Sequence, residues 1–416
     1  MSFKSALRSS VTGALLATAA MSLPSIAQES EETDARRLST VVTTAQRVEQ
    51  DAQDVPISIT TVADEKLDNI RAGGADIRFL SARVPSVVAE SSFGRAFPRF
   101  YIRGVGNTDF DLNASQPVSL VYDDVPYENP ILKGYPVFDL EGVEVLRGPQ
   151  GTLFGRNTPG GIIKFDSVKP GEEFNGYLKG SLGAYNTTEV EAAVGFRPGE
   201  VLALRFSGIY QQRDPFVDNE FTLFENTTSE DDRYEGFEEY AGRVQALWSP
   251  TPVTDILVNL HARKNESDAR LFRANVIEKG QRGLRSDFDF DSVSFDGQNF
   301  LEQESSGATI RIDHELNDAL DFTYIYGHES AEVQSRGDID GGFGAAFLPE
   351  GNMGPGFIPF PSESAGGVDS LTQITHEVRL ARDGGGPLRW QAGVFFFEED
   401  VAISSRSFDT LAPDQP

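Results

Sequence analysis

From residue 174 onward the chain alternates between apolar and polar residues, and this period restricts the fold more than any other feature. The stretch 201–210 (VLALRFSGIY) shows the alternation clearly. A period of two places successive side chains on opposite faces of a β-strand. No apolar run in the chain reaches the roughly 18 residues that a transmembrane helix needs. We therefore expect strands with one face towards lipid and the other towards a polar interior.

About nine such segments follow one another along the chain. Short turns between them alternate with long loops at 213–236, 268–304 and 334–370. An outer-membrane barrel has this arrangement because only its external side tolerates large insertions. A soluble β-sandwich is the alternative, but nothing in that fold requires the alternation. The expected strands are 174–185, 187–197, 201–212, 237–248, 255–267, 305–316, 320–333, 371–382 and 388–404.

The N-terminus has the pattern of an export signal. Lys4 and Arg8 precede a mostly apolar stretch at 11–23, and Ser25 and Ala27 place small residues where a signal peptidase cleaves. The stretch is too short to span a bilayer as a helix. We expect a signal peptide at residues 1–27, with a buried amphipathic helix as the alternative.

Two further zones precede the alternating segments. Residues 28–37 are charged and poor in apolar residues, which predicts disorder up to a β-branched stretch at 38–45. That stretch could pair as an added strand with a partner, or be the first strand of the next domain. From 48 to 168, short strand-like pieces, Gly-rich turns and helices after Asp64 and Asp76 predict a compact α/β domain.

Composition and motifs give no support for an enzyme. The net charge of -28 argues against nucleic acid as a partner, and the chain has no cysteine to ligate a metal. The Gly-rich stretch 148–161 lacks the Gly-Lys-Ser/Thr of a phosphate loop. The series Asp287, Asp289 and Asp291 lacks the glycine and glutamate that complete a calcium loop. We expect no catalytic residue, no cofactor and no metal site.

Three blocks of the 48–168 domain carry a family resemblance. They are residues 101–106 (YIRGVG), 121–127 (VYDDVPY) and 139–163 (DLEGVEVLRGPQGTLFGRNTPGGII). In this order they closely resemble the plug signature of TonB-dependent receptors, and the stretch 38–45 then resembles that family's TonB box. The motif residues are Arg103, Gly104, Arg147, Gly148, Pro149, Gly151, Gly155, Arg156, Gly160 and Gly161. The box residues are Leu38, Ser39, Thr40, Val41, Val42, Thr43, Thr44 and Ala45.

The resemblance implies a small α/β plug domain followed by antiparallel transmembrane β-barrel strands in the bacterial outer membrane. The domains would be a signal peptide (1–27), a disordered segment with the TonB box (28–47), the plug (48–168) and the N-terminal part of the barrel (174–416). Barrels of this kind close at about 22 strands, so about nine strands predict a truncated or split chain. Only 28–37 separates the signal from the box, which leaves no room for an additional signalling domain.

The implied function is active import of a scarce nutrient: a ferric siderophore, a corrinoid or an oligosaccharide. TonB and its inner-membrane proton-gradient motor would pull on the box, lipid would surround the barrel, and the nutrient would bind from outside. The alternative is a non-transporting surface protein, either an adhesin or a degenerate receptor fragment. Glycines of the motif suit tight turns, and Arg103, Arg147 and Arg156 could pair with carboxylates of the barrel wall.

Outward-facing plug loops are the expected ligand site. Their aromatic and hydrogen-bonding residues suit a neutral, hydroxyl-rich ligand, because Arg95 and Lys133 are the only basic residues there. The alternative is that the aromatic residues only pack the plug against the wall. The candidates are Phe93, Arg95, Phe97, Asp109, Phe110, Asp111, Asn113 and Gln116.

Overall fold

The structure is a computed structural model of the chain. The structure describes residues 42–43, 47, 50–51, 55–63, 67, 76–81, 83–91, 93–109, 111–220, 233–273, 276–277, 280–295, 297–339, 341, 362–382 and 388–409. One compact unit spans Val41–Pro416. The expected signal peptide, the expected disordered stretch and residues 38–41 and 44–45 of the expected TonB box lie outside the described residues.

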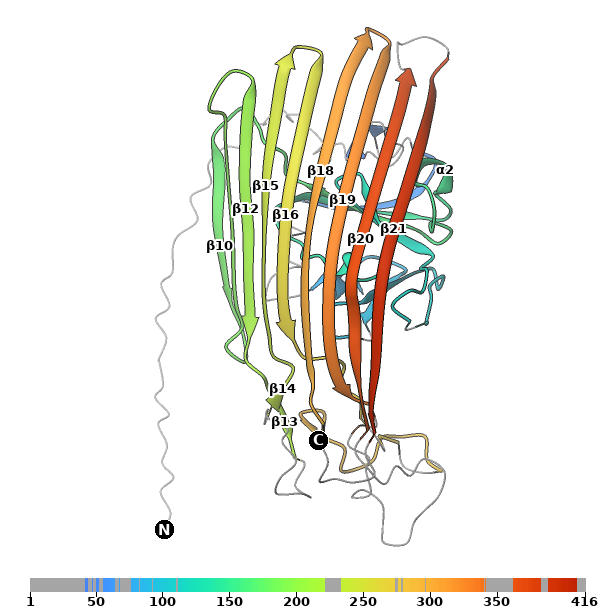
Figure 1. Ribbon diagram of the computed structural model, residues 1–416, viewed down its shortest axis with the longest axis vertical. Coiled ribbons are helices and arrows are strands. Elements are labelled where there is room, and N and C mark those ends of the chain that lie inside the picture. Colours follow the sequence, from blue (N-terminus) through green and yellow to red (C-terminus); the bar gives the residue numbers. More distant parts are fainter. Residues whose placement is uncertain are drawn as a thin grey trace, which may run out of the picture. The chain divides into compact units, whose positions relative to one another are not determined.

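Nine consecutive strands form one large antiparallel sheet, each hydrogen-bonded to the next along the chain (Figure 1). Each of the predicted alternating segments corresponds to one strand, so the predicted order is confirmed. The turns from β11 to β12, β15 to β16 and β18 to β19 are short, and the long connections leave the opposite ends. The strands are β10 (Asn175–Leu182), β11 (Thr188–Phe196), β12 (Leu202–Arg213), β15 (Phe237–Thr251), β16 (Thr254–Ser267), β18 (Phe300–Asn317), β19 (Leu320–Asp338), β20 (Ser362–Arg382) and β21 (Trp390–Asp409).

Three strands run further into the predicted loops than the alternation suggests. β18 begins at Phe300, β19 continues to Asp338, and β20 begins at Ser362. The added residues are mostly charged or small, so they lack the apolar alternation that marks a strand in sequence. Backbone ladder bonds to the neighbouring strand do not require apolar side chains, and the pairing of Gly337 with Ser364 continues the register.

Side chains of the large sheet alternate between a buried polar face and an exposed apolar face. On β15, Arg243 and Gln245 are buried, while Val244 and Trp248 are exposed. On β16 the same holds for buried Asn259 beside exposed Leu260, a residue that is 52% exposed. A polar inner face and an apolar outer face are the pattern expected of a membrane barrel wall. Within the described part of the chain, no helix is long and apolar enough to cross a membrane.

The long connections carry a small sheet that the sequence did not predict. Its strands are β13 (Val217–Asn219), β14 (Arg233–Tyr234) and β17 (Ser292–Val293), with β17 parallel to β13. Val217, Tyr234, Val293 and Phe295 form its apolar core. The first two long connections therefore fold together, although nearly sixty positions of chain separate β14 from β17.

The N-terminal domain (residues 42–168) is built on a five-stranded sheet of order β3-β8-β9-β6-β7. Its pairs are antiparallel except β6 with β9, which are parallel. Two strand pairs, β1 with β2 and β4 with β5, lie outside this sheet. The strands are β1 (Val42–Thr43), β2 (Gln50–Asp51), β3 (Ser58–Ala63), β4 (Val87–Ser91), β5 (Pro98–Ile102), β6 (Val118–Tyr122), β7 (Val125–Tyr127), β8 (Leu140–Arg147) and β9 (Gly161–Ser167).

Helix is scarcer in this domain than predicted. The helix expected after Asp76 is only a 3-10 turn, η1 (Ile77–Leu80), because Ser81 leaves the helical region and its hydroxyl bonds to Ala89 of β4. The other short elements are η2 (Leu132–Gly134) and a single α-turn, α2 (Gly151–Phe154), within the Gly-rich motif. Of the helix expected after Asp64, only Leu67 is described.

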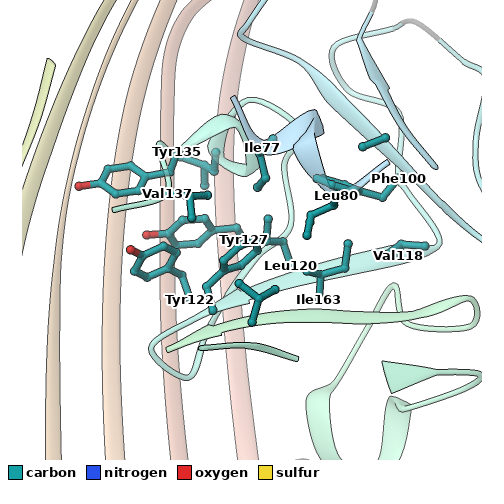
Figure 2. Close-up of a cluster of buried hydrophobic side chains, with 14 of the residues drawn as sticks. Ile77, Leu80, Phe100, Val118, Leu120, Tyr122, Tyr127, Tyr135, Val137 and Ile163 are labelled. Atoms are coloured by element: carbon teal, nitrogen blue, oxygen red, sulfur yellow. The ribbon is translucent and has the colours of Figure 1, made fainter. Parts of the chain in front are cut away.

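One apolar core joins the N-terminal domain to the large sheet. Tyr122, Tyr127 and Tyr135 gather at its edge beside the strands of that sheet (Figure 2). Tyr122 stacks on Tyr127 with ring centroids 6.0 Å apart and meets Tyr135 edge-on at 5.5 Å. Ile325 of β19 belongs to the same cluster. Because the core continues across the boundary, the N-terminal domain packs directly on the inner face of the large sheet.

Candidate functional site

A two-residue turn between β6 and β7 directs two carboxylates at the large sheet. Its central residues, Asp123 and Asp124, both have positive φ, at 45° and 70°. This is the backbone of the tight hairpin turn that usually takes Asn-Gly, so aspartates are held there at a conformational cost. The position is useful because each side chain reaches a different set of polar partners.

Asp123 binds the end of the N-terminal domain and the large sheet. It accepts hydrogen bonds from the Ser167 hydroxyl at 2.7 Å and from Asn259 of β16 at 3.1 Å, and it pairs with Lys169. Burial alone would raise the pKa of Asp123, but the positive charges of Lys169 and Arg243 outweigh it and lower that pKa to about 2. The carboxylate is therefore charged at neutral pH.

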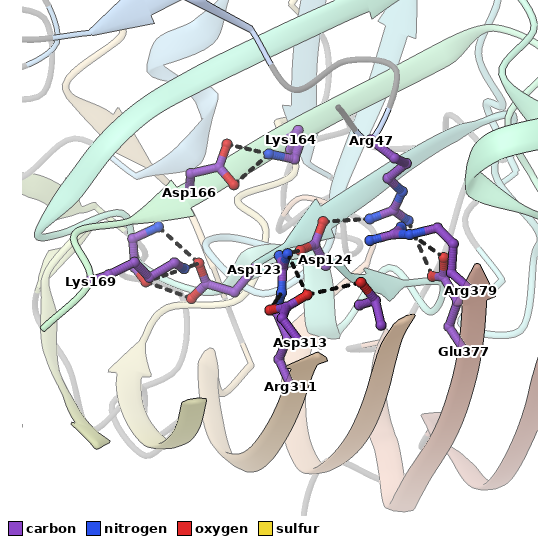
Figure 3. A network of polar contacts seen from close by, with 12 residues as sticks. Arg47, Asp123, Asp124, Lys164, Asp166, Lys169, Arg311, Asp313, Glu377 and Arg379 are labelled. Atoms are coloured by element: carbon purple, nitrogen blue, oxygen red, sulfur yellow. Dashed lines mark hydrogen bonds and ion pairs between the residues drawn. The ribbon is translucent and has the colours of Figure 1, made fainter. Parts of the chain in front are cut away.

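Asp124 joins three segments of the chain (Figure 3). One carboxylate oxygen pairs with Arg47 and the other with Arg311 of β18. Arg47 also lies 3.4 Å from the Glu377 carboxylate of β20, and its guanidinium sits 4.2 Å from the centre of the Phe154 ring. Burial opposes the charge on Asp124, yet the two arginines hold its pKa well below the usual range. Arg47 lies two positions after the expected TonB box.

Two more buried ion pairs cross from the N-terminal domain to the large sheet. Arg205 of β12 donates to Asp139 at 2.8 Å. Arg95 donates to Glu239 of β15 at 2.6 Å, and Arg263 of β16 donates to the other oxygen of Glu239, also at 2.6 Å. Removing one partner of such a buried pair leaves an uncompensated charge. Each pair therefore favours a single position of the domain against the sheet.

The motif arginines make other contacts than those expected. Arg147 donates to the Pro85 carbonyl at 2.9 Å and to Thr60 at 2.8 Å, both within its own domain. Arg156 is 3.9 Å from Glu128 of the same domain, and stacks on Phe397 of β21 at 4.6 Å. Arg103 is exposed at φ 53° in a turn. Among the residues described, none of these three lies within ion-pair distance of a carboxylate of the large sheet, although the charge of Arg156 acts on Glu399 of β21.

Ion pairs across the boundary run in both directions: arginines of the large sheet pair with aspartates of the N-terminal domain, and Arg47 and Arg95 pair with glutamates of the sheet. Sequence reasoning missed Arg205, Arg243, Arg263 and Arg311. Their signal was present, because each occupies an inward position of the alternating pattern. Arg47 carried a weaker signal, as a single basic residue between the box and the first turn of the domain.

Two motif glycines are required by backbone geometry. Gly161 has φ 138°, and a Cβ there would lie 2.2 Å from the Leu146 carbonyl oxygen. Gly148 has φ 98° and begins the Gly-Pro turn after β8. Both conformations disfavour residues with a side chain.

The ligand candidates separate into buried and exposed groups. Phe97 is fully buried and meets Phe93 edge-on at 5.6 Å, so these rings pack within the protein. Gln116 is buried too, while Asp109, Asp111 and Asn113 form an exposed loop of successive side-chain-capped turns. Phe110 lies outside the described residues. Among the described residues, the candidates therefore do not share one exposed surface.

The two basic residues noted near these loops are also in buried positions. Lys133 is fully buried and donates to the Val118 carbonyl at 2.9 Å. Arg95 is committed to Glu239, as described above. Of the expected TonB box, Val42 and Thr43 form β1 and pair with Gln50 and Asp51.

Comparison with known families identifies this domain. The family model described as TonB-dependent Receptor Plug Domain matches residues 51–162. The chain carries the plug of a TonB-dependent receptor. The N-terminal domain is this plug, and the large sheet has the fold of the wall that encloses it. The family match and the fold together assign the chain to the bacterial outer membrane.

Known relatives support the same assignment. The pesticin receptor of Yersinia pestis is 31% identical over 170 residues, which cover 40% of this chain and 24% of the relative. The ferrioxamine receptor of Yersinia enterocolitica is 23% identical over 244 residues, covering 58% of this chain and 31% of the relative. The ferric yersiniabactin uptake receptor FyuA from Yersinia pestis shares the fold, with a TM-score of 0.67 and 20% identity over 86% of this chain. The matched part of this chain corresponds to 50% of the FyuA chain, so the chain spans about half the length of that receptor.

Proposed function

We propose that the chain supplies the plug and the first wall strands of a receptor that imports a ferric siderophore across the outer membrane, driven by TonB. The relatives support this ligand class, since they include a ferrioxamine receptor and a ferric yersiniabactin uptake receptor. Buried ion pairs hold the plug against the wall, which supports an import pathway that stays closed until the plug moves.

Arg47 is the observation that carries the proposal. It lies just after the box residues Thr43, Thr44 and Ala45, and it is attached to plug and wall at once. A force applied to the box would act on the pairing of β1 with β2 and then on this residue. It would then act on Asp124 and, through it, on the contact with Arg311. The arrangement suits a receptor in which pulling on the N-terminal segment is coupled to release of the plug from the wall.

Deletion of residues 38–45 in the full-length protein tests the energy coupling. Iron-starved cells should lose uptake of the radiolabelled ferric siderophore but keep binding at low temperature, because the deletion removes only β1 from the plug and leaves its five-stranded sheet and the wall intact. The matched control deletes residues 28–35, a stretch of the same length that precedes the box, and should retain uptake. Undiminished uptake without the box would indicate a passive pore instead.

A second comparison addresses the alternative of a non-transporting surface protein. In iron-starved cells that have this protein as their only candidate receptor, a non-transporting protein would give no uptake of any ferric chelate, with or without the box. Uptake that depends on both this protein and the membrane proton gradient would rule the alternative out.

A further inference from the structure

A row of inward-facing positions crosses five strands of the large sheet and meets the plug hairpin formed by β6 and β7. Two side chains of the row bind the hairpin directly: one donates to the Tyr122 hydroxyl at 2.7 Å, and another donates to the Pro126 carbonyl at 2.8 Å. The register places in this row Arg243, His261, Gly307, Glu329 and Gln373, on β15, β16, β18, β19 and β20 in that order.

His261 and Glu329 meet across the gap that Gly307 leaves. Their strands are not neighbours, since β18 lies between them, and strands two apart are separated by about 10 Å. The Nε2 atom of His261 nevertheless lies 3.0 Å from Oε2 of Glu329. A Cβ at Gly307 would lie 2.5 Å from that nitrogen and closer still to the carboxylate oxygen. The glycine is therefore what allows the two side chains to meet.

The plug contacts the same nitrogen of His261. The Tyr127 hydroxyl of β7 lies 3.3 Å from Nε2, and the Tyr135 ring meets the imidazole edge-on at 5.1 Å. His261, Glu329 and Tyr127 are each more than nine-tenths buried. The second carboxylate oxygen of Glu329 has no hydrogen-bond partner among the described residues. Two groups, one from the plug and one from the wall, therefore compete for one nitrogen.

A single imidazole nitrogen cannot serve both partners fully. With a lone pair on Nε2, the ring accepts the Tyr127 hydroxyl proton; with a proton on Nε2, it donates to the Glu329 carboxylate. A positively charged ring carries protons on both nitrogens, so it can only donate, and the carboxylate is then the stronger acceptor. Tyr127 loses its acceptor in that state, because no other group in the described part of the chain accepts its proton.

Charged and titratable groups face the His261 ring from the other strands and from the plug. Most of them are bound elsewhere: the two nearest arginines donate to Tyr122 and to Glu239, and the nearest aspartate pairs with Lys169. Glu329 is the carboxylate left to attract a charged ring. The groups are Arg243 of β15, Arg263 of β16, Glu329 of β19, and Asp123, Tyr127 and Tyr135 of the plug, while β18 contributes only Gly307.

We propose that His261 is a positioning residue for plug release, bound to Tyr127 when its ring is neutral and to Glu329 when its ring is charged. The inference rests on the proposed import function, because it concerns how firmly the wall holds the plug. Tyr127 ends the hairpin whose turn carries the carboxylate paired with Arg47 and Arg311, so loss of its bond loosens that part of the plug. Histidine side chains change charge between about pH 5 and pH 8, so mild acid favours release.

Hydrogen exchange of the full-length protein in detergent tests the inference. Mass spectrometry reads the segment 118–127, which spans β6 and β7, at pH 5.5 and pH 8, across the range in which histidine changes charge. Rates are expressed as protection relative to the unfolded peptide, which removes the intrinsic effect of pH. In the wild type, protection should be about fivefold lower at pH 5.5, the size expected from loss of one neutral hydrogen bond. His261→Gln cannot change charge, so its protection should be equal at both pH values.

Two further variants separate positioning from folding. Tyr127→Phe keeps the packed ring but removes the hydroxyl, so it should show low protection at both pH values. The matched control is His376→Gln, because His376 also lies beside a tyrosine hydroxyl, 2.9 Å from Tyr324, but this pair lies within the wall. It should keep the pH dependence of the wild type. The inference is wrong if the wild type shows no pH dependence or is better protected in acid, or if the dependence persists in either test variant.

Uptake by iron-starved cells separates this inference from the proposed function. If uptake of a ferric siderophore depends on the protein and on the proton gradient while exchange of the hairpin is insensitive to pH, the role of His261 is wrong and siderophore import stands. If the exchange profile is as expected but the cells import no ferric chelate, the proposed function fails and the pH-dependent contact between His261 and Tyr127 stands.

Discussion

Asp124 of the plug and Arg311 of β18 form a half-buried ion pair, and the second oxygen of the same carboxylate pairs with Arg47. A single side chain therefore connects the segment after the expected TonB box, the plug and the wall. Its turn is a tight two-residue hairpin with positive φ at both positions, so the carboxylate cannot move far without disturbing β6 and β7. This makes the contact a defined point at which force on the N-terminal segment meets the plug.

Replacing Arg47 with alanine should loosen the N-terminal segment. The change removes a nearly buried partner of Asp124 and the stacking on Phe154, at a cost of about 3 kcal/mol. Because the chain has no cysteine, a spin label on Gln50→Cys reports on β2 alone. We expect a larger mobile fraction in its spectrum. Arg233→Ala, which removes an exposed ion pair, should leave the spectrum unchanged.

An unchanged spectrum in Arg47→Ala would mean that β1 and β2 are held by their own pairing. In that case the connection from the box to Asp124 would lose its mechanical significance. Uptake measured in the same variant would then stay at the level of the wild type.

Acid should weaken the contact between the plug and the wall by protonating Asp123. Its pKa falls from 3.8 in the unfolded chain to about 2 in the folded protein. The stability this contributes, about 2 kcal/mol, is complete above about pH 4 and is lost as the pH falls through about 2. Unfolding measured between pH 5 and pH 2 should show this loss in the wild type. Asp123→Asn should be less stable at neutral pH and show a flatter decline in acid, whereas exposed Asp109→Asn should follow the wild type.

Gly161→Ala should destabilise the plug sheet. The added Cβ would meet the Leu146 carbonyl oxygen of the paired strand β8, and alanine is strained at φ 138°. We expect a loss of about 1–3 kcal/mol, measured by chemical unfolding or by increased cleavage of the plug by a protease. Gly199 in the β11–β12 turn has open space around it and is the matched control. Equal stability of the two variants would contradict the strained conformation.

The sequence predicted the large sheet well because its evidence is local. Each strand such as β16 alternates by itself, and consecutive order along the chain fixes its neighbours. The ends of β18 and β20 were missed because ladder bonds continue through charged and small residues that carry no alternating pattern. The helix after Asp76 was overpredicted because capping signals ignore the competing bond from Ser81 to β4.

The candidate site was predicted less well because its contacts join distant segments. Asp124 meets Arg47 and Arg311 across separations that no local pattern encodes. The motif arginines were assigned to the wall from their chemistry alone, and chemistry does not distinguish a carbonyl of the same domain from a carboxylate across the boundary.

Leu260 tests whether the outer face of the large sheet lies in lipid. The residue is near the middle of β16 and points away from the plug, and it is 52% exposed in the chain itself. In a soluble protein, arginine would be tolerated at so exposed a position. In a membrane wall, Leu260→Arg places a charge in the hydrocarbon layer and should cost about 2–4 kcal/mol. Glu266→Arg is the matched control, because it lies on the same face of the same strand, near the extracellular end, where a charge should cost little. Folding into lipid vesicles, followed by gel mobility of unheated samples, measures both. We expect a reduced folded fraction for Leu260→Arg only, and equal folding of the two variants would show that this face is not in contact with lipid.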